Sequence, residues 1–164
     1  MSKTTEPWWN NRRGEWYVIL QGLLFALVVL GPKTAPGLPV WSGRWTAGLA
    51  LAGVALVIAG GLLSASAVFR LGSNLSALPH PVEGAKLVAS GPYRFVRHPI
   101  YAGIILAALG WGLCNRSTLG VFYAVLLFVF FDIKSRREEF WMRQKLADYA
   151  DYQTRVRKLV PFVY

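Results

Sequence analysis

Residues 45–69 read WTAGLALAGVALVIAGGLLSASAVF, a run of 25 residues without a charged side chain. A helix of this length crosses the roughly 30 Å hydrocarbon core of a bilayer with some tilt. Small residues recur in the run at three- and four-residue spacing, which lets helices approach closely in lipid. These residues are Gly48, Ala52, Gly53, Gly60, Gly61, Ser64 and Ala65. We therefore expect a membrane-spanning helix that packs tightly on a neighbour.

Three more apolar blocks accompany this run, at residues 16–30, 100–114 and 118–133. Only the polar break at residues 115–117 separates the last two, which predicts a tight helical hairpin. Hydrophobic residues make up 54% of the 164 residues and fall in these blocks. The sequence therefore predicts an all-α polytopic membrane protein with about four transmembrane helices.

The basic residues show how such a protein would be oriented. The net charge is +10, with 18 Lys and Arg residues against 8 Asp and Glu residues. If the amino terminus is cytoplasmic, only Lys33, Arg44 and Arg116 of these cations lie on the outer side. This positive-inside bias predicts that both termini are cytoplasmic, and it explains the charge without a nucleic-acid partner. The compact four-span form favours a prokaryotic plasma membrane.

We expect the chain to divide at residue 70. Residues 1–69 would hold a polar lead-in, with Trp8 and Trp9 at headgroup level, and the first two spans. Residues 70–164 would form the functional core: a long cytoplasmic loop at 70–99, the hairpin and a carboxy-terminal amphipathic helix. A loop of this length in a compact chain is usually functional. In it His80, between two prolines, is either a ligand or base or simply solvated.

A polar cluster precedes the third apolar block, in residues 91–101, GPYRFVRHPIY. Pro99 suits the first turn of a helix, where its missing N–H has no consequence. The residue before a proline is driven from helical geometry, so His98 should be the cap. The free N–H groups of this helix terminus would attract an anionic group. The cluster therefore predicts a binding site at the mouth of an apolar helix.

A second polar cluster follows the fourth block. Residues 134–156 have the pattern of one amphipathic helix, whose packed stripe continues back through Glu138 and Lys134. Glu138 should therefore point inward, one turn from Lys134, while Glu139 should point outward and pair with Arg143. The alternative is that Lys134 and Glu138 form only a surface pair. The hairpin should bring this cluster beside the first. The stripe comprises Met142, Leu146, Tyr149, Gln153 and Val156.

These segments together resemble the isoprenylcysteine carboxyl methyltransferase and phospholipid methyltransferase superfamily of integral membrane enzymes. The resemblance covers roughly residues 70–164. It is carried by KLVASGPY at 86–93, RHPIY at 97–101, the Glu138-Glu139 pair, YADY at 149–152 and VPF at 160–162.

This resemblance implies binding of S-adenosylmethionine without a Rossmann domain, and the chain has no dinucleotide-binding glycine motif. Lys134 and Glu138 take the catalytic positions, and no metal is implied. Lys134 stands where carboxyl methyltransferases have a substrate-facing arginine, and lysine lacks the two-pronged fork that grips a carboxylate. The positions matching the cofactor pocket are Ala85, Lys86, Leu87, Val88, Tyr93, His98, Pro99, Ile100, Tyr101 and Glu138.

The implied methyl acceptor is a small lipophilic or amphiphilic molecule that enters from the bilayer between helices. An isoprenylcysteine-like carboxylate, a lipid amine and a thiol all remain open. Two other classes are considered: an NADPH-dependent membrane reductase of the sterol-reductase type, which usually has Asn where Ile100 stands, and a non-catalytic membrane scaffold. We further expect Glu138→Gln to abolish methylation and Glu139→Gln to be tolerated.

Overall fold

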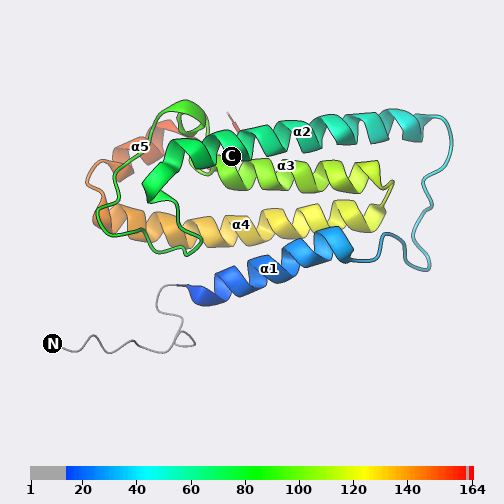
Figure 1. Ribbon diagram of the computed structural model, residues 1–164, viewed down its shortest axis with the longest axis horizontal. Coiled ribbons are helices and arrows are strands. Elements are labelled where there is room, and N and C mark those ends of the chain that lie inside the picture. The colour runs from blue at the N-terminus through cyan, green and yellow to red at the C-terminus, as the bar shows by residue number, and fades with distance from the viewer. Residues whose placement is uncertain (1–13, 162) are drawn as a thin grey trace.

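The computed structural model describes residues 14–161 and 163–164, so the expectation for Trp8 and Trp9 lies outside it. The described chain is helical and contains no β-strand, only an isolated bridge between Val96 and Arg157. Four long helices lie side by side along the molecule (Figure 1). They are α1 (Glu15–Leu30), α2 (Trp45–Leu71), α3 (Pro99–Cys114) and α4 (Thr118–Lys145). Each helix begins and ends within two residues of the apolar block that predicted it, except that α4 continues well beyond residue 133. The four predicted blocks are therefore confirmed as helices.

Three short elements gather at one end of this bundle (Figure 1). They are the 3₁₀ turns η2 (Gly72–Asn74) and η3 (Gly91–Arg94) and the helix α5 (Tyr149–Arg155). Of the long helices, α2 and α4 are long and apolar enough to cross a membrane, while α1 and α3 are shorter apolar helices. The functional cluster expected at residues 91–101 therefore lies at the end of the bundle where α2 and α4 finish and α3 begins.

Helices α2 and α3 are in backbone contact through glycines. Gly53 lies against Gly110, and Gly60 lies against Gly103 one heptad further along. A Cβ atom on Gly110 would be 2.5 Å from the Gly53 carbonyl oxygen, and one on Gly103 would be 2.5 Å from that of Gly60. The prediction of close helix packing by the small residues of α2 is confirmed at these positions. This contact holds the amino terminus of α3 beside the carboxy-terminal half of α2.

We expect Gly60→Ala to destabilise the protein by about 2 kcal/mol, in the range of core overpacking. The added methyl group would meet the backbone of Gly103 and Ala107, which cannot move without separating the helices. The matched control is Gly61→Ala, because no atom lies within 4 Å of its added Cβ. Thermal unfolding in detergent should show a lower midpoint for the first variant only. Equal midpoints would contradict the packing argument.

Helix α1 is held against α4 by aromatic pairs. The rings of Tyr17 and Phe130 lie 6.3 Å apart between centroids, and those of Phe25 and Phe131 are equally spaced. At the far end, the Ser117 hydroxyl accepts a hydrogen bond of 2.8 Å from the Gly120 N–H and so caps α4. The ring pairs place α1 beside α4, and a hydrogen bond of 3.0 Å from the Ser117 N–H to the Gly112 carbonyl confirms the tight hairpin between α3 and α4.

The carboxy-terminal segment differs from its prediction. A single helix over 134–156 is wrong: α4 ends at Lys145, and the short α5 follows after a turn. Tyr149 and Tyr152 are buried, and the Tyr152 hydroxyl donates to the Tyr93 carbonyl at 2.5 Å. Met142, Leu146 and Tyr149 of the predicted stripe all face the protein body, on both sides of the break. Periodicity alone therefore could not reveal the turn.

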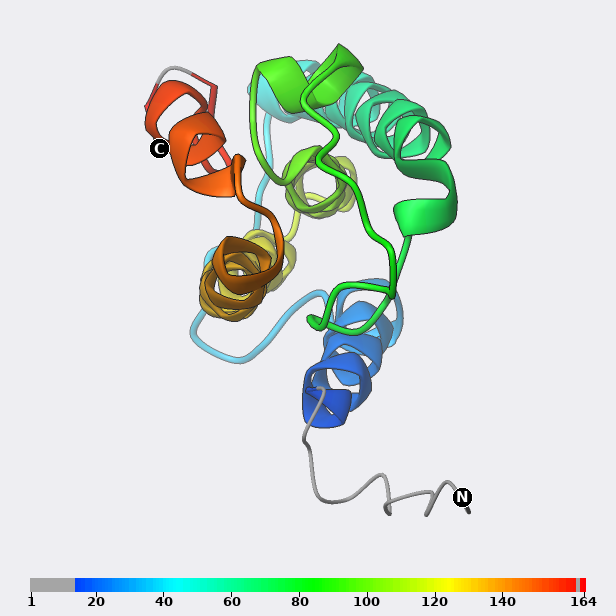
Figure 2. The ribbon, with the colours of Figure 1, turned by 90° about the vertical axis from the view of Figure 1, so that its left-hand side faces the viewer.

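The connection between α2 and α3 crosses the end of the bundle (Figure 2). Its irregular structure confirms the loop expected at 70–99, although α2 extends to Leu71. Asn74 fixes it by accepting from the Lys86 N–H and donating to the Lys86 carbonyl, both at 3.2 Å. Gly91, with a positive φ of 62°, turns the chain into η3. The loop thereby forms a cover over the helix ends.

Candidate functional site

A cavity of about 340 Å³ lies between the helix ends and this cover. Its size is within the roughly 300–1,000 Å³ of small-molecule sites. Lys134 and nine of the ten residues proposed for cofactor binding line it. Those nine are Ala85, Lys86, Leu87, Val88, Tyr93, His98, Ile100, Tyr101 and Glu138. The tenth, Pro99, is buried as the first residue of α3 and lies outside the lining.

The start of α3 has the predicted geometry. His98 is its N-cap, and the Ala102 N–H donates to the His98 carbonyl at 3.0 Å to close the first turn. The His98 ring stacks on Tyr101 with centroids 5.5 Å apart, and Tyr101 stacks on Phe131 at 4.2 Å. This column of rings fixes both cavity-lining side chains against the core of the bundle.

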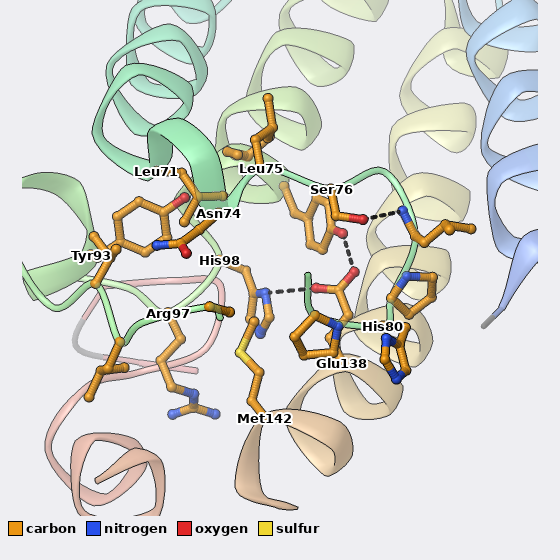
Figure 3. A pocket seen from close by; sticks show the side chains of 18 of the residues that line it. Leu71, Asn74, Leu75, Ser76, His80, Tyr93, Arg97, His98, Glu138 and Met142 are labelled. Atoms are coloured by element: carbon orange, nitrogen blue, oxygen red, sulfur yellow. Dashed lines mark hydrogen bonds and ion pairs between the residues drawn. The ribbon is translucent and has the colours of Figure 1, made fainter. Parts of the chain in front are cut away.

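Glu138 is the acidic group of the cavity (Figure 3). It is 7% exposed and accepts a short hydrogen bond from the Tyr101 hydroxyl. The His98 Nδ1 lies 3.5 Å from its second oxygen. A carboxylate has about four acceptor positions, so these contacts leave capacity for a further donor or cation. The inward direction predicted for Glu138 is confirmed.

Glu139 is also buried, so its predicted outward pairing with Arg143 is wrong. It accepts from Arg97 Nε at 2.8 Å and Gln153 Nε2 at 2.6 Å, and its Oε1 lies 3.0 Å from His98 Nε2. Arg143 instead donates to Gln153 Oε1 at 2.5 Å. Glu139 would face solvent on a lone helix, but the folded-back α5 covers this face. Glu139 is outside the cavity lining and contacts the His98 ring through Nε2, while His98 Nδ1 faces Glu138.

Lys134 is not half of a surface pair, because it is only 1% exposed. Its ammonium donates to Gln21 Oε1 at 2.6 Å and to the Ala77 carbonyl at 3.0 Å, and lies 5.3 Å from the centroid of the Tyr101 ring. One cation thus joins α4, α1 and the loop. The prediction omitted Gln21, although it is an amide in an otherwise apolar block and polar groups in such blocks usually have a partner.

Tyr93 contributes a second hydroxyl, which donates to the Ala67 carbonyl at 3.4 Å. Burial, and to a smaller extent the negative charge of Glu138, raise the pKa of Tyr93 to about 12. The hydroxyl therefore stays protonated near neutral pH and remains a donor. His80 also lines the cavity and packs edge-on against Trp141, with centroids 5.2 Å apart.

Several lining residues carried no signal in the sequence. Four of them lie where α2 ends and the loop begins: Leu71, Asn74, Leu75 and Ser76. Beyond the end of the helix, the direction of a side chain does not follow the helical repeat. Met142 belonged to the predicted packed stripe, and the structure places it in the cavity lining. Figure 3 shows it beside His98 and Glu138. Leu71, Leu75 and Met142 contribute apolar surface to the cavity wall, and Asn74 and Ser76 contribute polar surface.

The fold and cavity are those of a helical protein with a polar site at the end of an apolar bundle. The sequence model of the phospholipid methyltransferase family matches residues 49–148. The chain belongs to this family. The matched region contains most of α2, all of α3 and α4, and the loop, but not α1.

The chain is also similar to curated relatives. It is 36% identical over 123 residues to protein-S-isoprenylcysteine O-methyltransferase of Rattus norvegicus, covering 70% of this chain and 42% of that protein. It is 32% identical over 116 residues to the probable protein-S-isoprenylcysteine O-methyltransferase of Oryza sativa subsp. indica, covering 68% and 60%. A cobalt-zinc-cadmium resistance protein, CzcN, of Cupriavidus metallidurans is 27% identical over 157 residues, covering 93% and 64%. The chain thus spans about half the length of the methyltransferase relatives.

A solved structure has a similar fold. It is the eukaryotic intramembrane Ras methyltransferase ICMT, isoprenylcysteine carboxyl methyltransferase, with a TM-score of 0.61. The match covers 93% of this chain and 54% of that chain, at 23% identity. Together with the two long apolar helices, this fold is that of an integral membrane protein.

Proposed function

We propose that this protein is an integral membrane methyltransferase that uses S-adenosylmethionine to methylate a small lipophilic or amphiphilic acceptor. The observation that carries the proposal is the cavity, in which Glu138, His98 and two tyrosines converge at the start of α3. It occurs in a chain of the phospholipid methyltransferase family. The proposed catalytic residues Lys134 and Glu138, and the proposed cofactor-binding residues other than Pro99, line this cavity.

The side chains fit the proposed cofactor chemically. Glu138 would accept from an ammonium or ribose hydroxyls, and the first N–H groups of α3, beside Pro99, would hold a carboxylate. The ring of Tyr93 suits a sulfonium cation. When bound, S-adenosylmethionine supplies an activated methyl group for an in-line displacement. The protein's part is to align donor and acceptor and to exclude water.

We further propose that all four long helices span the membrane, with the cavity and both termini on the cytoplasmic side of a prokaryotic plasma membrane. The distribution of basic residues supports this orientation. The acceptor would enter from the bilayer between helices, as Gln21 of α1 and Ile104 of α3 both line the cavity. An isoprenylcysteine-like carboxylate, a lipid amine and a thiol are the candidate acceptors. The reductase and scaffold alternatives have less support, because the family match favours a methyltransferase.

Calorimetry in detergent with S-adenosylhomocysteine tests the proposal, with NADPH as the competing ligand. We expect binding of the first and none of the second. Incubating membranes with methyl-labelled cofactor and identifying labelled products by mass spectrometry should then reveal the acceptor. Tight NADPH binding, or binding of neither ligand, would overturn the proposed function.

We expect Tyr101→Phe to weaken S-adenosylhomocysteine binding about fivefold and His98→Ala about tenfold, consistent with loss of one hydrogen-bonding group each. The phenylalanine keeps the stack on Phe131 and removes only the donor to Glu138. Tyr123→Phe is the matched control, because its hydroxyl donates to the Pro32 carbonyl at the opposite end of the bundle. Wild-type affinity in both site variants would show that the pocket is misassigned.

A further inference from the structure

Gln21 occupies an unusual position. It lies in the middle of α1, whose other residues from Val18 to Leu30 are all apolar or glycine. A primary amide is costly to place in such a helix unless it is bound. Its oxygen is bound by the Lys134 ammonium, and both side chains line the cavity. The helix that lies outside the family match thus contributes a polar group directly to the site.

The contacts of this pair leave two kinds of donor unused. Lys134 has three N–H groups, of which one faces Gln21 and one the Ala77 carbonyl. Within residues 14–161 and 163–164, no protein atom accepts a hydrogen bond from the remaining N–H or from the Gln21 NH₂ group. A cation and an amide NH₂ group therefore lie side by side, from two different helices.

We propose that Gln21 and Lys134 together recognise the methyl acceptor, by holding an anionic oxygen group, carboxylate or phosphate, at the head of an apolar tail. Lysine alone is a point charge, whereas bidentate recognition needs two neighbouring donors. Gln21 supplies the second donor and sets the position of the ammonium. The apolar faces of α1 and α3 beside the pair suit the tail. The inference rests on the proposed methyltransferase function and makes α1 the element that selects the acceptor.

The test uses three probes with the same twelve-carbon tail: dodecanoate, dodecyl phosphate and dodecyltrimethylammonium. Their apparent affinities are measured from thermal unfolding midpoints of the full chain in a non-ionic detergent. We expect wild type to bind at least one anion about tenfold more tightly than the cation, and the tighter anion identifies the head group. Equal affinities for all three probes would overturn the proposal.

Gln21→Glu gives the sharpest comparison. It keeps the contact to Lys134, and hence the docking of α1, but replaces the NH₂ donors by a second negative oxygen. We expect an unchanged or raised midpoint without probe and at least a tenfold loss of anion affinity. Gln21→Leu should also lose about tenfold, and adding it to Lys134→Met should cause no further loss, because Gln21 acts with Lys134. Gln144→Leu, at an exposed glutamine of α4, should behave as wild type.

Affinity for S-adenosylhomocysteine separates the two proposals. It should be unchanged in both Gln21 variants, since recognition of the acceptor is distinct from that of the cofactor. Undiminished anion binding by Gln21→Glu, or equal losses of anion and cofactor affinity, would overturn the role of Gln21. A wild-type chain that binds the anions but not S-adenosylhomocysteine would contradict the proposed function alone.

Discussion

Glu138→Gln should raise the dissociation constant of S-adenosylhomocysteine at least a hundredfold and abolish methyl transfer, while the protein stays folded. Glu138 faces the cavity, and among the described residues its close side-chain partners are the Tyr101 hydroxyl and the more distant His98 ring. A buried charge-assisted contact is worth about 3 kcal/mol when truncated, which corresponds to more than a hundredfold in affinity.

The same substitution should leave the unfolding midpoint unchanged or raise it. A buried carboxylate without a strong ion pair carries a desolvation cost, and the isosteric amide removes it. The matched control is Glu83→Gln, which changes an exposed carboxylate in the loop between α2 and α3, outside the cavity lining, and should change neither quantity. Loss of affinity accompanied by loss of stability would mean that Glu138 serves the fold rather than a ligand.

The features that the sequence predicted well are those with a single dominant physical cause. The four long helices follow from uninterrupted apolar blocks, and His98 and Pro99 define the start of α3 because proline restricts its predecessor. The inward direction of Glu138 follows from the helical repeat, since it shares a face with Lys134. The cofactor-pocket positions were predicted from the family resemblance. The residue pattern alone does not identify them.

The features that were missed depend on contacts between distant segments. Gln21 meets Lys134 across 113 positions in the chain, and nothing local to either residue names the other. The turn after Lys145 does not interrupt the apolar spacing, so the sequence pattern predicts one helix where the structure has α4 and α5. That error contributes to the wrong direction for Glu139, because α5 covers its face together with Arg97 and His98. The helical repeat shows which residues share a face of one helix, but it does not show which distant segments pack on that face in the fold.

Glu139→Gln should lower the free energy of unfolding by about 3 kcal/mol, as expected when one partner of a buried ion pair is removed. This reverses the tolerance expected from the sequence. Glu139 accepts from Arg97 and Gln153 and contacts His98, so it links α4 both to the segment before α3 and to α5. The amide would leave the Arg97 guanidinium, whose side chain is 10% exposed, without its counter-charge.

Asp151→Asn is the matched control, since it removes a carboxylate that pairs with Arg155 at 2.6 Å on the exposed side of α5. An exposed pair of this kind contributes less than about 1 kcal/mol. Chemical unfolding in detergent should therefore separate the two variants by roughly 2 kcal/mol or more.

Affinity for S-adenosylhomocysteine should fall only several-fold in Glu139→Gln, because Glu139 contacts His98 from outside the cavity. The adjacent carboxylates would then have opposite signatures, Glu138 in binding and Glu139 in stability. Equal stability of Glu139→Gln and wild type would show that α5 does not depend on this ion pair.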